Sequence, residues 1–208
     1  MTENFFLKEV IDKIENKDMI DIFKKYLSNE DVCCSTLQLI IKENEKLKKH
    51  EDIFIEAHKL FVASQRMLDD LACKDITPYE NRDMDVVMCF TFYAGVCTIL
   101  KKHLPEDLCE KILDIYEEAN LRMNVPRDNE EENEVFFFIL REYFTKFYVP
   151  LRLISCKVNI NEYDFGFVYY KEVLKEDNVP NFILKKMSGN KIEIKLAQEV
   201  LALCMKNE

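Results

Sequence analysis

The stretch that decides the fold is residues 83–102, which read DMDVVMCFTFYAGVCTILKK. Between Asp85 and Lys101 this stretch is apolar on every face of a helix, a pattern typical of a helix surrounded by other helices. The apolar run of about 15 residues is short for a membrane span, which needs roughly 20. We therefore expect the central buried helix of a bundle, and no insertion into a membrane.

Gly95 lies inside this helix, where a glycine costs about 1 kcal/mol relative to alanine. The chain of 208 residues has only 3 glycines, and the other two are Gly166 and Gly189. Close approach of a neighbouring helix is the simplest compensation for a glycine at this place. We expect a helix–helix contact over Gly95.

Helical periodicity continues on both sides of residues 83–102, because apolar residues recur every three to four positions. We expect further helices near residues 6–14, 19–26, 28–47, 52–73, 105–124 and 135–149. Polar loops are expected at 74–82 and 126–134. Pro105 suits the start of a helix, and Pro150 is expected to end the last one. Residues 1–149 are thus predicted to be an acidic bundle of about seven helices, in a mainly α chain.

After Pro150 the period of the apolar residues changes from about 3.6 to about 2, which indicates strands. Strands are expected near residues 154–160, 163–169, 182–186 and 191–196. The last two flank Met187, Ser188, Gly189 and Asn190, which are expected to form the turn of a hairpin. Residues 151–208 are therefore predicted to be a small α+β module of about four strands and one helix.

The formal net charge is -10, and it is distributed unevenly. Residues 151–208 hold 9 basic and 8 acidic residues, whereas residues 1–150 hold 20 basic and 31 acidic ones. This acidic body repels phosphate backbones, which disfavours a general nucleic-acid binder. The same electrostatic field attracts basic protein surfaces.

Eight cysteines occur without a CxxC motif or a zinc-finger spacing. Most stand where an apolar residue is expected, and free cysteine behaves as a small hydrophobe in such places. We expect reduced core thiols and a cytoplasmic protein. For the adjacent Cys33 and Cys34, core packing and a role in redox sensing or partner contact both remain open.

The sequence has no phosphate-binding loop, dinucleotide fingerprint, nucleophile elbow or zinc-protease motif. None of its 3 histidines follows a glutamate by three residues, which removes the di-iron bundle pattern. Asp69 and Asp70 are expected at a solvated helix edge, and His58 near the edge of an apolar stripe. We predict no catalytic residue, no cofactor and no metal ligand.

These features predict a non-catalytic interaction or regulatory protein, an adaptor or small subunit that docks on a larger protein or a ribonucleoprotein assembly such as the ribosome. The partner is expected to present a basic surface, and any RNA contact to be local, through Lys185 and Lys186. Aromatic anchors beside acidic residues are the predicted contact residues: Glu130, Glu131, Glu132, Phe136, Phe137, Phe138, Tyr163, Tyr169 and Tyr170.

Two other classes of function stay open at the level of the sequence. The first is a helical regulator with a hydrophobic groove that captures a partner helix. The second is an enzyme with an unrecognised site built on a cysteine or on carboxylates.

Overall fold

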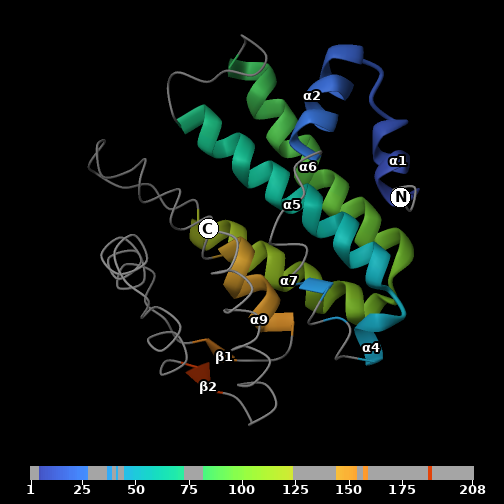
Figure 1. Cartoon of the computed structure of the whole chain (residues 1–208), viewed down its shortest axis with the longest axis vertical. Coiled ribbons are helices and arrows are strands. Elements are labelled where there is room, and N and C mark those ends of the chain that lie inside the picture. Colours follow the sequence, from blue (N-terminus) through green and yellow to red (C-terminus); the bar gives the residue numbers. More distant parts are fainter. Residues whose placement is uncertain are drawn as a thin grey trace.

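The computed structural model describes residues 5–27, 37–38, 41, 45–72, 82–123, 144–153, 157–158 and 187–188, and this part of the chain is mainly α, as predicted (Figure 1). Its helices are α1 (Phe5–Ile11), α2 (Lys17–Leu27), α4 (Glu45–Lys48), α5 (Glu51–Ala72), α6 (Arg82–His103), α7 (Glu106–Met123), the π-helix η1 (Phe144–Tyr148) and α9 (Val149–Leu153). The strands β1 (Lys157–Val158) and β2 (Met187–Ser188) form one antiparallel pair.

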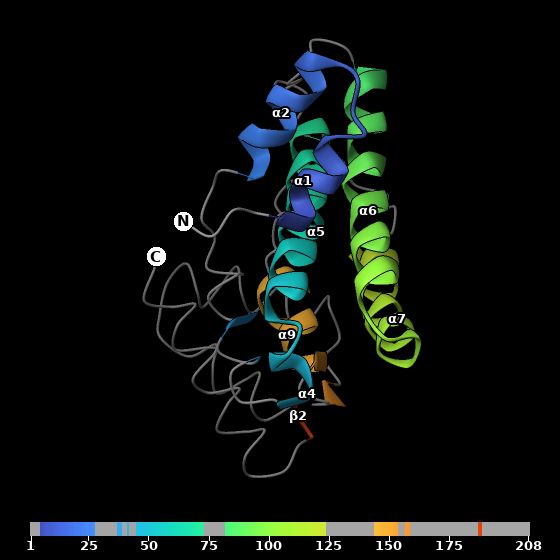
Figure 2. The same ribbon diagram turned by 90° about the vertical axis from the view of Figure 1, so that its right-hand side faces the viewer.

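The long helices α5 and α6 pack side by side, and α1, α2 and α7 lie against this pair (Figures 1 and 2). The helix α2 packs against α5 and α6, where the ring of Phe23 stacks on that of Phe92 at 4.5 Å between centroids. The helix α7 contacts α6 and α9. One connected hydrophobic core joins all of these helices.

The most enclosed helix of the described part is α5, and not α6. Its buried apolar residues come from every side of the helix: Ile53, Phe54, Ile55, Ala57, Leu60, Phe61, Val62, Ala63, Met67 and Leu71. In α6, Val86, Val87 and Phe90 are exposed. The prediction that α6 is surrounded on every face was therefore wrong, because apolar composition alone does not determine which faces receive a neighbour.

The predicted helix–helix contact over Gly95 is confirmed. A Cβ atom built on Gly95 would lie 3.0 Å from Cδ1 of Leu60 in α5 and 3.2 Å from Cγ1 of Val10 in α1. Both distances are shorter than ordinary van der Waals contact, so a side chain at position 95 would have to displace one of these neighbours. Glycine at this position lets three helices meet.

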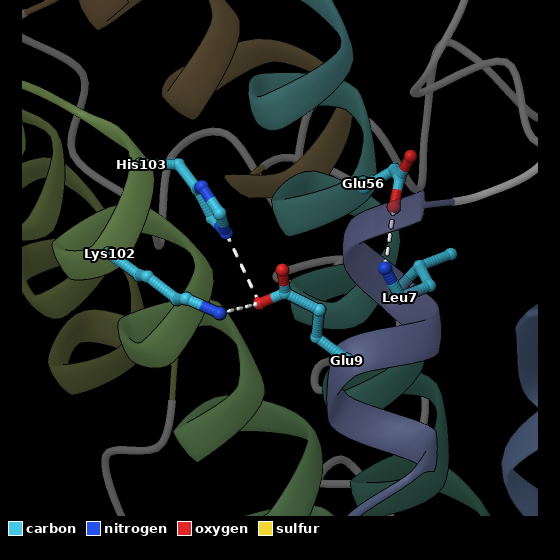
Figure 3. Close-up of polar contacts among 5 residues, drawn as sticks. All are labelled: Leu7, Glu9, Glu56, Lys102 and His103. Carbon is cyan, nitrogen blue, oxygen red and sulfur yellow. Dashed lines mark hydrogen bonds and ion pairs between the residues drawn. The ribbon is translucent and has the colours of Figure 1, made fainter.

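Long-range polar contacts anchor the seven-residue helix α1, which is too short to be stable by itself. The carboxylate of Glu56 in α5 accepts a hydrogen bond of 2.6 Å from the backbone N–H of Leu7, in the first turn of α1 (Figure 3). On the other side, Glu9 accepts hydrogen bonds from Lys102 at 2.6 Å and from Nε2 of His103 at 3.2 Å. The helix α1 is therefore fixed to both α5 and α6.

Two expectations from the sequence are corrected, one about where a helix ends and one about a hairpin turn. Pro150 does not end the helical region, because it is the second residue of α9, where a helix requires no N–H group from proline. Met187 and Ser188 do not lie in a hairpin turn; they form β2 and pair with Val158 and Lys157 of β1, respectively. The pairing with β1 provides backbone hydrogen-bond partners that an open turn would lack.

Among the described cysteines, Cys89 and Cys109 are buried, Cys97 is half-buried, and all three are free thiols. The prediction that cysteines fill apolar core positions is thus confirmed for Cys89 and Cys109. The pair Cys33 and Cys34 lies outside the described residues.

Candidate protein-interaction surface

The residues that the sequence predicted to contact a partner all lie outside the described residues, and their prediction stays untested. They are Glu130, Glu131, Glu132, Phe136, Phe137, Phe138, Tyr163, Tyr169, Tyr170, Lys185 and Lys186. A candidate surface must therefore be sought on the described helices. Two adjacent helices, α6 and α7, provide one.

An apolar strip runs along the outer face of α6, and we call Val86, Val87, Phe90 and Ala94 the outer strip. Phe90 is 70% exposed and Val87 is 47% exposed, and Ala94 is exposed as well. Val86, Val87 and Ala94 each lie three or four residues from Phe90, so the four residues share one side of the helix, opposite the side that packs on α5. Large exposed apolar side chains grouped in this way mark interaction sites more often than single ones do.

An acidic stripe runs along the exposed face of α7. Five carboxylates with helical spacing lie there, and we call Glu106, Asp107, Glu110, Asp114 and Glu117 the acidic stripe. Lys111 is the only basic residue among the exposed residues of this helix. The opposite face of α7 packs into the core through Ile112, Ile115, Tyr116 and Ala119.

Glu117 brings the acidic stripe next to α6. Burial raises the pKa of the Tyr93 hydroxyl and of the Cys97 thiol, and the charge of Glu117 contributes to both shifts. Tyr93 and Cys97 lie on α6 beside the outer strip, one turn from Phe90 and Ala94. The two helices form one edge of the molecule (Figure 2). Glu117, at one end of the acidic stripe, is therefore the stripe residue that lies near the outer strip.

The buried polar groups between α5 and α7 hold the two helices together. Nδ1 of His58 lies 3.0 Å from the hydroxyl oxygen of Tyr116, and Nε2 of Gln65 donates to Oδ1 of Asn120 at 3.0 Å. His58 is fully buried, not at the edge of a stripe as the sequence suggested. Its partner lies 58 residues away in the sequence, so no local pattern could have identified the pair.

A second polar group lies where α2, α5 and α6 meet. Asp70 was expected to be solvated, but it is half-buried and accepts a hydrogen bond from the hydroxyl of Tyr26. Burial, and next the hydrogen bond to Asp70, raise the pKa of Tyr26. Burial also raises the pKa of the Cys89 thiol to about 12, with the charges of Asp85 and Asp70 adding to the effect. A thiol of this kind is protonated at neutral pH and is a poor nucleophile.

No group of three His, Cys, Asp or Glu side chains within the described ranges is arranged to hold a metal ion. By length and composition, α6 is the one helix of these ranges that could cross a membrane, and 44% of its apolar window is buried inside the fold. A core helix of a globular protein has the same composition. Its packing on α5 places one side of α6 in the core.

No protein-family model matches the chain, and no curated protein or solved structure matches it. The candidate surface therefore rests on the geometry of α6 and α7. The acidic spacing of residues 106–117 is visible in the sequence. The outer strip is not, because it could be identified only once the covered faces of α6 were known.

Proposed function

We propose that this protein is a non-catalytic adaptor or small subunit of the cytoplasm, which docks on a basic surface of a larger protein or ribonucleoprotein assembly through α6 and α7. The observation that carries the proposal is the outer strip of α6 beside the acidic stripe of α7. The strip supplies apolar area for affinity, and the stripe supplies a charged rim that selects a basic partner.

The apolar part has enough area for a useful contribution. Full burial of one phenylalanine side chain stabilises a contact by about 1.5–3 kcal/mol, and Phe90 is largely exposed in the free protein. A partner that covers Phe90 and Val87 together gains affinity from both side chains. The helix face is convex, so this arrangement favours docking on a partner surface over capture of a helix in a groove.

The charge of the chain favours a basic partner over a second copy of itself. Two copies that meet through α6 and α7 would bring two acidic stripes together, each in a chain of net charge -10. Like charges in contact are costly, whereas lysine and arginine on a partner would pair with the stripe. The experiment below treats self-association as a separate outcome.

The proposal is tested with two synthetic helical peptides of matched length, one built from leucine and lysine and the other from leucine and glutamate. Binding to the full chain is measured by fluorescence anisotropy at several salt concentrations. We expect the lysine peptide to bind, with affinity that falls as salt rises, and the glutamate peptide not to bind. Phe90→Ser should weaken binding at least about tenfold, which corresponds to about 1.4 kcal/mol.

Matched controls locate the effect on α6 and α7. Phe5→Ser removes an exposed aromatic residue of α1, and it should leave binding unchanged. The double variant Glu110→Lys/Asp114→Lys should slow association, whereas Glu15→Lys/Asp21→Lys, with the same change in net charge, should have a much smaller effect. Equal effects of variant and control would contradict the proposed surface. Dimer formation or binding to neutral lipid vesicles that depends on Phe90 would contradict the proposed partner.

The same assay tests the contact residues predicted from the sequence alone. Reversal of Glu130, Glu131 and Glu132 to lysine should also slow association if residues 130–138 extend the rim of this surface. No slowing, while the α7 variant slows association, would restrict the proposed surface to α6 and α7.

We also propose that residues 151–208 form the α+β module and that residues 1–149 form the bundle of about seven helices. The antiparallel pairing of β1 with β2 lies inside the proposed module and supports it. Backbone chemical shifts measured by NMR should indicate strands at 163–169 and 191–196. Helical shifts across both ranges would contradict the module.

A further inference from the structure

A cluster of two arginines and one glutamate lies where α7 meets η1 and α9. Figure 1 shows α7 and α9 next to each other. Glu118 is shared, because its Oε1 lies 3.3 Å from Nη1 of Arg122 and its Oε2 lies 3.7 Å from Nη2 of Arg152. Two guanidinium groups therefore face one carboxylate. Within an acidic chain, this cluster holds one excess positive charge.

The two arginines differ in how many contacts their guanidinium groups make. The guanidinium of Arg122 lies over the rings of Phe144 and Tyr148, at 5.6 Å and 5.2 Å from their centroids, and it donates to the Tyr148 hydroxyl at 3.3 Å. These contacts fix Arg122 in place. Arg152 has the 3.7 Å approach to Glu118, which is too long for a hydrogen bond.

Nε of Arg152 is buried and has no hydrogen-bond acceptor in the described structure. A buried N–H group of a charged side chain is costly to leave without an acceptor, and such a group calls for an explanation such as a bound ion. The Arg152 side chain as a whole is 35% exposed, so an anion can reach its exposed part from solvent. Arg152 therefore combines a buried N–H donor that lacks an acceptor with a side chain that is partly exposed to solvent.

We propose that Arg152 is the centre of an oxyanion-binding site, which takes a phosphate or carboxylate group. The Nε–H and one Nη–H of a guanidinium point in parallel and match two oxygens of such a group. Arg122 adds a second positive charge nearby, and Glu118 is the competing carboxylate that the anion displaces. The site is independent of the outer strip, so it can hold true whether or not the proposed function does.

The test uses the full chain and inorganic phosphate, with acetate as the carboxylate probe and chloride of equal ionic strength as the reference. The side-chain Nε–Hε resonance of Arg152 is followed by NMR during each titration. Phosphate or acetate should shift this resonance in a saturable manner, and chloride should not. A saturable shift with one probe alone identifies the group that the site prefers.

Variants give opposite expected effects, which separates the site from a general charge effect. The Arg152 variants lack this resonance, so phosphate binding to them is followed through the Nε–Hε resonance of Arg122, which contacts the same Glu118. Arg152→Gln should weaken phosphate binding at least about tenfold, as expected for loss of a bidentate charge-assisted pair. Arg152→Lys should also weaken binding, because lysine lacks the planar fork. Glu118→Gln should strengthen binding several-fold, because it removes the competing charge. Lys111→Gln, on the exposed face of α7, is the matched loss of one positive charge and should change little.

The proposal is overturned if the Arg152 resonance responds to chloride as it does to phosphate, which would indicate an adventitious ionic effect. It is equally overturned if Glu118→Gln weakens binding or if Lys111→Gln weakens it as much as Arg152→Gln. Saturable binding that is lost in Arg152→Gln and gained in Glu118→Gln supports it.

Discussion

Single residues decide how closely the helices of this protein approach one another, and Gly95 is the clearest case. Alanine at this position would gain about 1 kcal/mol of helix propensity. Its Cβ would also meet Leu60 at 3.0 Å and Val10 at 3.2 Å. Overpacking of a core costs about 1–3 kcal/mol, and the β-branched Val10 can adjust little. The clash therefore outweighs the gain in propensity.

We predict that Gly95→Ala lowers the free energy of unfolding by roughly 1 kcal/mol, measured by urea denaturation. Thr98→Ala, on the same helix, should change it by less than about 0.5 kcal/mol. Combining Gly95→Ala with Leu60→Ala should cost less than the sum of the two single changes, because the double variant removes part of the clash. A Gly95→Ala variant more stable than the wild type would contradict the close contact.

The thiols form a second prediction at the scale of residues. Burial raises the pKa values of Cys89, Cys97 and Cys109, and for Cys89 the value reaches about 12. In the native protein at pH 8 these thiols should react slowly with an alkylating reagent, whereas Cys33 or Cys34 should react first. Mass spectrometry of partly labelled protein gives the order. Labelling of Cys89 before Cys33 and Cys34 would contradict this prediction.

At the scale of elements, α1 depends on two acidic residues with opposite pKa shifts. Burial raises the pKa of Glu56, although the backbone N–H groups of Leu7 and Phe6 oppose the shift. Stability due to the raised pKa of Glu56 is present at low pH and is lost as pH rises through its folded value. Hydrogen bonds from Lys102 and next from His103 lower the pKa of Glu9. Stability due to Glu9 is present above its ordinary value of 4.5 and is lost as pH falls through its folded value.

Glu56→Gln and Glu56→Ala should therefore differ clearly at pH 7. Glutamine keeps an oxygen that accepts the Leu7 N–H and removes the buried charge, so unfolding free energy should hold or rise. Alanine leaves a buried N–H without an acceptor, which should cost about 1–3 kcal/mol. Urea denaturation measures both variants, and hydrogen exchange of the α1 amides should be faster in Glu56→Ala. Equal stability of the two variants would contradict the role of Glu56 as an acceptor.

Glu9→Gln tests the other side of α1 by hydrogen exchange. At pH 7 the α1 amides should exchange faster in Glu9→Gln than in the wild type, because the contacts with Lys102 and His103 lose their charge. This difference should vanish as pH falls through the lowered pKa of Glu9. Lys8→Gln, on the exposed side of α1, is the control and should leave exchange unchanged. A difference that persists at low pH would contradict the electrostatic origin.

The length and the apolar periodicity of an element determine whether the sequence alone could predict it. The helices expected at 52–73, 83–102 and 105–124 are observed within one or two residues, because long apolar periods and Pro105 define them. The first helix ends three residues earlier than expected, at Ile11, and tight backbone turns follow it. The contacts of Glu56, His58 and Asp70 join different helices, so residue spacing could not reveal them. The exposed side of α6 was missed for the same reason.

At the scale of the whole molecule, the polar loops expected at 74–82 and 126–134 should be the first sites of proteolysis. Both ranges are polar and lack an apolar period, so little packing is expected to protect them. Limited digestion followed by mass spectrometry should find early cuts within residues 75–82 or 127–133. Early cuts inside α5 or α6, before either loop is cleaved, would contradict the bundle.

The anchoring of α1 has a consequence for synthesis on the ribosome. Glu9 of α1 contacts Lys102 of α6, which is 93 residues later in the chain. Val10 of α1 packs at Gly95, which also belongs to α6. Translation adds about 5–20 residues per second, so residues 5–11 wait roughly 5–19 s for α6 to be made. During this interval the side of α1 that packs on α6 has no partner, and the nascent chain exposes Val10 there. The first helix to be made can thus complete its docking only after α6 has been synthesised.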